Sequence, residues 1–239
     1  MAERPIFIPK PSTLELVREV FLRLTWHPGF SKVQKEKNIE ALHLAAEAVG
    51  YKRILEISTK SASKRGRHLS AFYLKIKTQH HKEILLESAF QGSKVFEGGG
   101  PFTDIYNMEA AEAKTDKRLK DSGRLIAFEF EGKRWPLEPT TAFYDWLYIG
   151  SVYPHREWAS KLYLYDGFSD IEFNPARSVN CQARSIALFL SLKKRNQLDE
   201  AMQSPESFIQ VLSQSAYCPH LHKEKTASGT LFDVEDISK

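Results

Sequence analysis

Cysteines, metal-ligand patterns and long apolar runs are all scarce in this 239-residue sequence. The two cysteines, Cys181 and Cys218, fit a reducing compartment and offer no metal-ligand spacing. The eight histidines form neither an HxxxH nor an HExxH pattern, so we expect no metal site. No stretch approaches the ~18 apolar residues of a membrane span, and MAERPIFIPKP lacks the apolar segment of a secretory signal. These absences predict a cytoplasmic protein without membrane contact.

Glycine and proline, at 12 and 11 residues, are too few for a collagen-like or low-complexity chain. Apolar residues make up 42% and charged residues 27%, which excludes wholesale disorder. The length suits one large domain or one domain with an extension. We therefore predict an N-terminal helical extension over 1–52, a main domain over 53–215 and a polar tail over 216–239.

The net charge of +4 conceals an uneven distribution. Residues 52–82 hold nine Lys or Arg residues and one acid, Glu56, so this segment carries +8 and the rest of the chain −4. A local basic field on an acidic body favours a polyanionic partner. A solvated basic loop is the alternative that charge alone leaves open.

The N-terminal region is predicted to contain two packed helices after an extended, proline-containing segment over 1–11. Apolar residues at helical spacing predict the first helix over 13–26. The second helix is predicted over 32–49, with Ser31 as its cap and Gly50 at its end.

Helices and short strands are predicted to alternate through the rest of the chain. Strands are expected at 53–58 and 69–77, separated by a flexible basic loop, and a hairpin over 124–137 turns at Glu131-Gly132. Segment 166–175 is expected to be irregular. Further helices are expected at 83–96, 107–119 with Asn107 as its cap, 140–150, 155–164, 181–194 and 205–214.

Three polar side chains stand in the otherwise apolar helix predicted over 83–96. Glu87, Gln91 and Lys94 are spaced i, i+4 and i+7, which places them within about 60° of one another around a helix. One interpretation is an exposed stripe with weak contacts along the helix. The other is the polar wall of a pocket, where a desolvated Lys94 loses its proton more readily and acts as a nucleophile. Glu87 then serves as general acid or base.

Glycines and aromatic residues near this helix are candidates for binding a nucleotide. The turn GGGPF (98–102) offers the backbone amides of Gly99 and Gly100 to a phosphate, with a simple helix stop as the alternative. Aromatic side chains are able to stack on a base, although each of them alone also fits a core position. They are Phe72, Tyr73, Phe102, Tyr106 and Trp135.

A second group of polar residues precedes the helix predicted over 181–194. Asn180 is either a ligand or an N-cap. Arg184 enters an apolar run and needs an anionic partner, which is either a phosphate or a carboxylate of the protein itself. Asp170 lies just before them in a loop, where binding residues often occur.

The blocks LSAFY (69–73) and ESAFQGSK (87–94) resemble the NADAR family, which is named for NAD and ADP-ribose. That family typically shows LSNFY followed by a helix reading E-H-x-F-Q-x-x-K. EAAEAK (109–114), the Trp135 region and DIEF…NCQARS are similar to its later blocks, and together the blocks cover about residues 53–195. Ala71 stands where the family usually has Asn and Ser88 where it has His, and DIEFNP lacks the usual Trp-Gly. The two ends of the chain resemble the NADAR antitoxins associated with DarT-type DNA ADP-ribosyltransferase toxins.

The resemblance implies an α+β fold, a mainly helical single domain with a small antiparallel sheet. It also implies removal of ADP-ribose from guanine bases in single-stranded DNA, with ADP-ribose as product and no cofactor. Glu87, Gln91 and Lys94 match the family's helical Glu, Gln and Lys, of which the lysine is implicated in a Schiff-base intermediate. We expect Glu87 to shuttle the proton and Gln91 to hold the ribose hydroxyls or to orient Glu87. The other residues expected to bind substrate are Ser70, Phe72, Tyr73, Gly99, Gly100, Phe102, Trp135, Asp170, Asn180 and Arg184. Lys64, Arg65 and Arg67 are expected to guide the DNA backbone.

Two other functions stay open at this point. The same site would suit a free nucleotide or a sugar-phosphate glycosylamine as substrate. A non-catalytic module that binds nucleic acid, or that binds the cognate DarT-type toxin directly, is the third hypothesis. The complete Glu87, Gln91 and Lys94 set favours an enzyme, while Ala71 keeps the binding module open.

Overall fold

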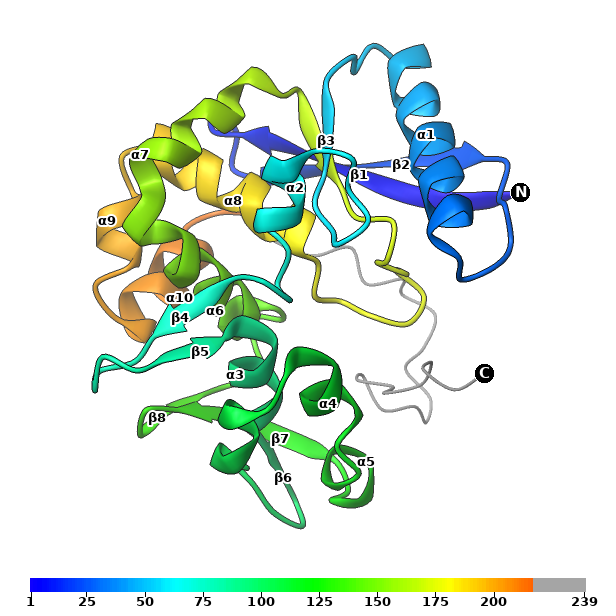
Figure 1. Cartoon of the computed structure of the whole chain (residues 1–239). Helices are drawn as coiled ribbons and strands as arrows, with labels where there is room; N and C mark the ends of the chain where they lie inside the picture. Colours follow the sequence, from blue (N-terminus) through cyan, green and yellow to red (C-terminus); the bar gives the residue numbers. More distant parts are fainter. Residues whose placement is uncertain (217–239) are drawn as a thin grey trace.

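A computed structural model describes residues 1–216, and Cys218 and nearly all of the predicted tail over 216–239 lie outside the described residues. Within them the chain is an α+β protein with a four-stranded sheet, two smaller antiparallel sheets and helices around them (Figure 1). The strand order of the larger sheet is β2-β1-β9-β3. No helix in this part of the chain is long and apolar enough to cross a membrane.

The N-terminal region is a β-hairpin followed by one helix, so the helix predicted over 13–26 is wrong. β1 (Ala2–Lys10) and β2 (Leu16–Leu24) pair antiparallel along their full lengths. Leu14, counted on the apolar face of the expected helix, is 62% exposed. Val20, Leu22 and Leu24, at every second position, instead pack in one cluster, as in a strand with one face buried.

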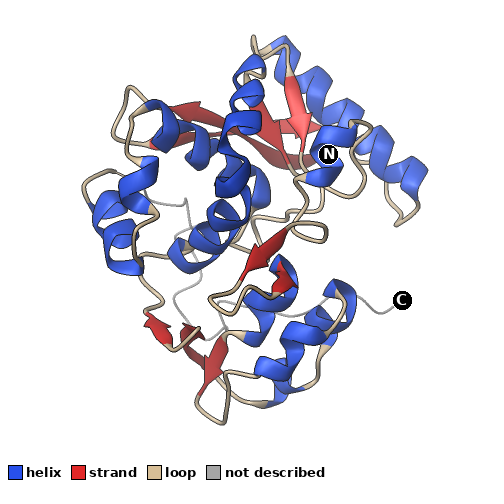
Figure 2. Ribbon diagram, turned by 60° about the vertical axis from the view of Figure 1, so that its left-hand side comes forward, coloured by secondary structure: helices blue, strands red, loops and turns tan. Residues whose placement is uncertain are grey.

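Both faces of this sheet are covered. α1 (Lys32–Ala48) begins at Ser31, whose hydroxyl accepts a hydrogen bond from the Gln34 amide, which confirms the predicted cap. Ile6 of β1 faces α1, whereas its neighbour Phe7 belongs to the main core on the other side. Figure 2 shows α1 and most other helices on opposite sides of the sheet.

β3 (Ile54–Glu56) confirms the strand predicted over 53–58, and it pairs in parallel with β9 (Gly167–Ser169). The segment 166–175 was expected to be irregular, so β9 is a correction. A strand of three residues is too short to show the two-residue alternation of apolar and polar side chains. Parallel pairing brings the carboxyl ends of β3 and β9 to the same edge of the sheet, next to Asp170.

The predicted helix over 83–96 is three elements: β5 (Glu83–Leu85), α3 (Leu86–Gly92) and β6 (Lys94–Phe96). β5 pairs with β4 (Lys75–Lys77). β4 is the only part of the strand predicted over 69–77 that the structure shows as a strand. The last residue of α3, Gly92, lets the Tyr106 ring approach the helix closely, since a Cβ atom there would lie 2.6 Å from that ring.

The predicted hairpin over 124–137 is confirmed as β7 (Leu125–Phe130) and β8 (Lys133–Trp135). Glu131 and Gly132 both have positive φ, as a tight two-residue turn requires. β6 completes this three-stranded sheet.

Two predicted helices are broken by local turns, and two short helices were not predicted. The expected helix over 107–119 is η1 (Thr103–Asn107), α4 (Ala110–Thr115) and α5 (Arg118–Asp121), and Asn107 ends η1 instead of capping a helix. The expected helix over 155–164 is η2 (Tyr153–His155), α7 (Arg156–Ala159) and η3 (Ser160–Leu164). The basic loop contains α2 (Lys64–His68), capped by Ser63, and α9 (Leu198–Ala201) was not predicted.

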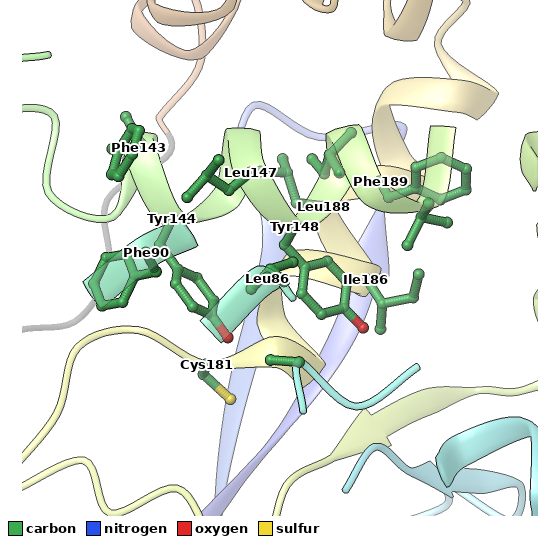
Figure 3. Close-up of a cluster of buried hydrophobic side chains, with 14 of the residues drawn as sticks. Leu86, Phe90, Phe143, Tyr144, Leu147, Tyr148, Cys181, Ile186, Leu188 and Phe189 are labelled. Carbon is green, nitrogen blue, oxygen red and sulfur yellow. The ribbon is translucent and has the colours of Figure 1, made fainter. Parts of the chain in front are cut away.

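The main core forms around α6 (Ala142–Val152) and α8 (Gln182–Lys194), and these two helices were predicted correctly, as was α10 (Pro205–Ser213). Phe143 of α6 stacks on Phe128 of β7 at 4.6 Å between ring centroids. Figure 3 shows the labelled side chains of α6, α8 and α3 meeting in one cluster. Since Phe7 and Leu16 join the same core, the N-terminal hairpin is continuous with it.

Candidate functional site

The three polar residues singled out on the sequence are buried together. Glu87, Gln91 and Lys94 are 7%, 5% and 4% exposed, which favours a pocket wall over a solvated stripe. The Gln91 side-chain amide donates a 2.8 Å hydrogen bond to the Glu87 carboxylate one turn earlier in α3. Lys94 lies in β6 and not on the helix, yet its Nζ is 5.1 Å from the centroid of the Phe90 ring.

Burial lowers the pKa of Lys94 from its ordinary value to about 8. The Glu87 charge opposes this shift, and the positive charge of Lys114 adds to it. The Lys94 amine has no hydrogen-bond or ion-pair partner among residues 1–216. With a pKa of about 8, roughly a tenth of the amine is neutral at pH 7 and half at pH 8. A neutral, unpaired amine is a nucleophile.

The backbone around Lys94 is fixed by a close approach that requires glycine. Gly100 has a φ of +93°, and a Cβ atom there would lie 2.3 Å from the Lys94 carbonyl oxygen. This glycine therefore brings its turn against β6. Gln91 has an unused group as well, since its buried Oε1 has no hydrogen-bond partner among the described residues.

Glu56 and Asp170 form a second group of buried, interacting carboxyl groups. Asp170 and Glu56 are 7% and 2% exposed, and burial raises the pKa of both. The Glu56 charge raises the pKa of Asp170 further. Burial, then the charges of Glu87 and Asp170 among others, raises the pKa of Tyr144. In Figure 3 the Tyr144 hydroxyl points toward the side on which Cys181 lies.

The LSAFY segment is tied to this pair through Gln182. The Ala71 amide donates a 2.8 Å hydrogen bond to the Gln182 side-chain oxygen, and the Gln182 side chain also hydrogen-bonds to Asp170. Ser70 is buried and its hydroxyl accepts from the Phe72 amide at 3.4 Å. The LSAFY segment therefore connects Asp170, through Gln182, with the more exposed side chains of Phe72 and Tyr73.

Phe72 and Tyr73, the two aromatic residues of the LSAFY segment predicted to stack on a base, are less buried than their neighbours Ser70 and Ala71. Phe72 is partly buried, and the Lys114 Nζ stands 6.0 Å from the centroid of its ring. Tyr73 is 59% exposed. Phe72 and Lys114 thus place a ring and a cation close to Lys94.

Several other predicted ligands have internal partners instead. Trp135 is 1% exposed and packs in the core against Phe143 and Trp146, the alternative that the sequence left open. Phe102 stacks on Phe96 and lies under the Arg118 guanidinium.

The glycine turn also has its amides in use. The Gly99 amide donates to the Phe96 carbonyl oxygen at 3.4 Å, and the Gly98 amide to Ser122 at 2.9 Å. The turn follows β6 and not a helix, so a helix stop does not describe it either. The predicted phosphate cradle consists of Gly99 and Gly100, and the bond of the Gly99 amide argues against its part in it, while Gly100 lies against the Lys94 carbonyl oxygen.

Arg184 forms an internal salt bridge, whereas Asn180 is not an N-cap. Arg184 is 3% exposed and forms ion pairs with Glu19 at 2.9 Å and Asp145 at 3.8 Å, which is the internal salt bridge left open above. Asn180 does not cap α8, because Cys181 occupies the cap position.

The predicted DNA-contacting residues lie on α2, directly before the LSAFY segment. Lys64 is exposed. Arg65 donates to the Tyr165 hydroxyl at 3.2 Å, and Arg67 to the Ser61 and Ala62 carbonyl oxygens. Both arginines therefore hold the local fold, and Lys64 alone presents an uncommitted charge.

Two cavities in the described part of the chain lie away from Lys94. One of about 280 Å³ is lined by Lys82, Tyr106 and Glu131 among others. The other, of about 320 Å³, reaches His43 on α1. Residues 1–216 contain no group of three or more His, Cys, Asp or Glu side chains that would hold a metal ion.

The sequence analysis missed Tyr144, Gln182 and Lys114 as parts of the site. Glu56 was also missed, although it carried a recognisable signal. It is the only acid in the basic segment 52–82 and stands within an apolar strand, ILEIS, where an acid needs a buried partner.

The sequence model of a family described as DarT1-associated NADAR antitoxin matches residues 2–221. No curated protein matches the chain significantly.

Proposed function

Because the chain belongs to the family of DarT1-associated NADAR antitoxins, we propose that it removes ADP-ribose from guanine bases of single-stranded DNA. This activity would reverse the modification made by a cognate DarT-type toxin. The observation that carries the proposal is Lys94, a buried amine with a lowered pKa and no partner among residues 1–216, close to Glu87.

The proposed reaction uses covalent catalysis. The neutral amine of Lys94 attacks the anomeric carbon of the ribose that is joined to guanine, and the carbon–nitrogen bond to the base breaks. Glu87 accepts the proton that the Lys94 amine loses and later activates the water that releases ADP-ribose. A Schiff base between Lys94 and the opened sugar is the expected intermediate.

Gln91 has two roles in this scheme. Its Nε2 holds the Glu87 carboxylate, and its buried, unpartnered Oε1 supplies an acceptor for a ribose hydroxyl. Leaving such an acceptor unpaired costs free energy in a folded protein. A bound sugar would remove that cost.

The proposal is tested with a guanine-ADP-ribosylated oligonucleotide and the full chain. Wild type is expected to release ADP-ribose, and Lys94→Ala to lose the activity while keeping its circular dichroism spectrum. Borohydride added during turnover should attach the mass of ADP-ribose at Lys94. Lys120→Ala, an exposed lysine on α5, is the matched control and should retain full activity.

The same experiment separates the other hypotheses. Faster release from a modified mononucleotide than from the oligonucleotide would indicate a free-nucleotide substrate. Protection of cells from the toxin that survives both Lys94→Ala and Glu87→Ala would indicate a non-catalytic binding module. Either result would overturn the proposed function.

A further inference from the structure

The carboxyl pair of Glu56 and Asp170 has no role in the reaction as described so far. Both groups are buried, and neither forms an ion pair with any of residues 1–216. Glu172, the next acid along the chain, is paired with Lys35 of α1 at 3.3 Å. Two buried carboxylates close together repel each other, so such a pair holds one proton.

Hydrogen bonds decide which of the two acids keeps that proton. Ser169 donates to Glu56 at 2.5 Å, the Ile171 amide donates to it at 2.9 Å, and the Ser58 side chain adds a further bond. Asp170 accepts from the Glu172 amide at 3.0 Å and from Gln182. Because donors stabilise the charged form of a carboxyl group, the better-supplied Glu56 is the anion and Asp170 the acid.

The N-terminal helix supports this arrangement. The His43 Nε2 lies 2.9 Å from the Ser169 hydroxyl. A hydroxyl has one proton, and Ser169 donates it to Glu56. The His43 Nε2 therefore carries the proton of the second hydrogen bond and donates it to the Ser169 oxygen. Burial lowers the pKa of His43 to about 4, so this neutral tautomer persists at physiological pH.

Asp170 is placed to act on the same substrate as Lys94. The Lys94 Nζ lies 5.1 Å from the centroid of the Phe90 ring, and the Tyr144 ring packs edge-on against Phe90 at 5.1 Å between centroids. The Tyr144 hydroxyl points toward the side on which Cys181 lies, next to Asp170 (Figure 3). The other groups that face Asp170 are Tyr148 of α6, Cys181 of α8 and Glu172. Cys181 Sγ lies 3.9 Å from Asp170 Oδ2.

We propose that Glu56, held by Ser169 and His43, is a positioning residue that keeps a proton on Asp170, and that Asp170 gives this proton to the departing guanine. The proton-transfer role rests on the proposed function. The guanine nitrogen takes the electron pair of the broken carbon–nitrogen bond together with the Asp170 proton. Hydrolysis by water then returns Lys94 to the neutral amine and Glu87 to the carboxylate, and the proton set free in this step restores the acid form of Asp170. The N-terminal region thereby becomes part of the acid–base chemistry.

The test combines single-turnover rates across pH with infrared spectroscopy of the protein alone. Wild type should show a bell-shaped profile, because the reaction needs neutral Lys94 and protonated Asp170. Glu56→Gln removes the charge that favours the protonated form of Asp170. The alkaline limb of the Glu56→Gln pH–rate profile should move to lower pH by at least one unit, which is about a tenfold loss of rate on that limb.

Ser169→Ala should behave differently from Glu56→Gln. It removes a donor to the Glu56 carboxylate and so moves the proton toward Glu56, which lowers the rate at all pH values without moving the alkaline limb. Ser191→Ala is the matched control, since Ser191 is also fully buried and bonds to the N-terminal hairpin at Leu16 and Lys10. Its profile should match wild type.

Infrared spectroscopy separates this inference from the proposed function. At neutral pH the full chain should show the carbonyl band of a protonated carboxylic acid, and Asp170→Asn should lose it. If the band is present but wild type releases no ADP-ribose, the proposed function fails and the carboxyl pair stands. Absence of the band, an unchanged profile in Glu56→Gln, or an equal loss in Ser191→Ala would overturn the inference.

Discussion

The side-chain amide of Gln91 donates a 2.8 Å hydrogen bond to the carboxylate of Glu87, and both groups are buried in the first and last turns of α3. A buried carboxylate is sensitive to the loss of a donor, because water cannot take its place. The bond therefore fixes the orientation of Glu87 relative to Lys94.

Replacing Gln91 tests this orientation directly. Gln91→Met keeps the approximate volume and removes the donor, so we expect a fall of about tenfold or more in single-turnover release of ADP-ribose, in line with the contribution of a positioned acid or base. Ser88→Ala, which loses a buried bond from the same helix to the Met108 carbonyl oxygen, should be nearly as active as wild type. Equal rates for Gln91→Met and wild type would show that Glu87 needs no such support.

The sequence predicted those parts of the site that lie close together along the chain. Glu87 and Gln91 share a helix as expected, because i and i+4 are neighbours in any α-helix. Lys94 is expected in the same helix but lies in β6, and its Nζ still lies beside Phe90 of α3 because the helix ends only two residues earlier.

Contacts between distant segments could not be predicted from local patterns. Arg184 pairs with Glu19, and Glu56 bonds with Ser169, although these residues lie far apart in the sequence. The strand β2 was misread as a helix because its apolar residues fit both periods, and pairing with β1 decides between them. In contrast, α8 was predicted correctly because its long apolar run is buried along almost its whole length.

Lys94 is expected to lower the stability of the folded protein. Its pKa falls from 10.5 to about 8 on folding. Below pH 8 the protonated amine is held in an unfavourable site, and stability rises with pH between about 8 and 10.5, because the unfolded chain then binds more protons. Lys94→Met should therefore raise the free energy of unfolding by about 3 kcal/mol at pH 7.

Urea denaturation of both proteins at several pH values measures this difference. The gap between Lys94→Met and wild type should narrow steadily above pH 8 and be small at pH 10.5. A variant that is less stable than wild type at pH 7 would contradict the lowered pKa of Lys94.

Lys114 is expected to tune the reactivity of Lys94. Its positive charge contributes to the low pKa of Lys94, so Lys114→Gln should raise that pKa. The pH midpoint of borohydride trapping at Lys94 should then move to higher pH, while the maximal rate changes little. Lys120→Gln removes an exposed lysine on α5 and should leave the midpoint in place. The same midpoint in Lys114→Gln and wild type would rule out this influence.

The Arg184 ion pairs should act mainly on stability. Arg184 is 3% exposed between Glu19 and Asp145, and removing one member of a buried ion pair leaves uncompensated charge. Arg184→Leu should lower the free energy of unfolding by about 3–5 kcal/mol in urea denaturation. A folded, equally stable Arg184→Leu variant with a much higher KM for modified DNA would instead identify Arg184 as a phosphate ligand.

The three basic residues of α2 should differ in their effects on DNA binding. Lys64 is exposed, so Lys64→Ala should reduce the salt dependence of binding to unmodified single strands by about 0.7 in the slope of log K against log salt, at unchanged stability. Arg67→Ala should instead destabilise the protein, since the guanidinium ties together the Ser61 and Ala62 carbonyl oxygens before the LSAFY segment. Fluorescence anisotropy across a salt series measures the slope, with Lys37→Ala on α1 as an exposed control. If Lys64→Ala and Lys37→Ala give the wild-type slope, α2 is a solvated basic helix and DNA approaches Lys94 along another surface.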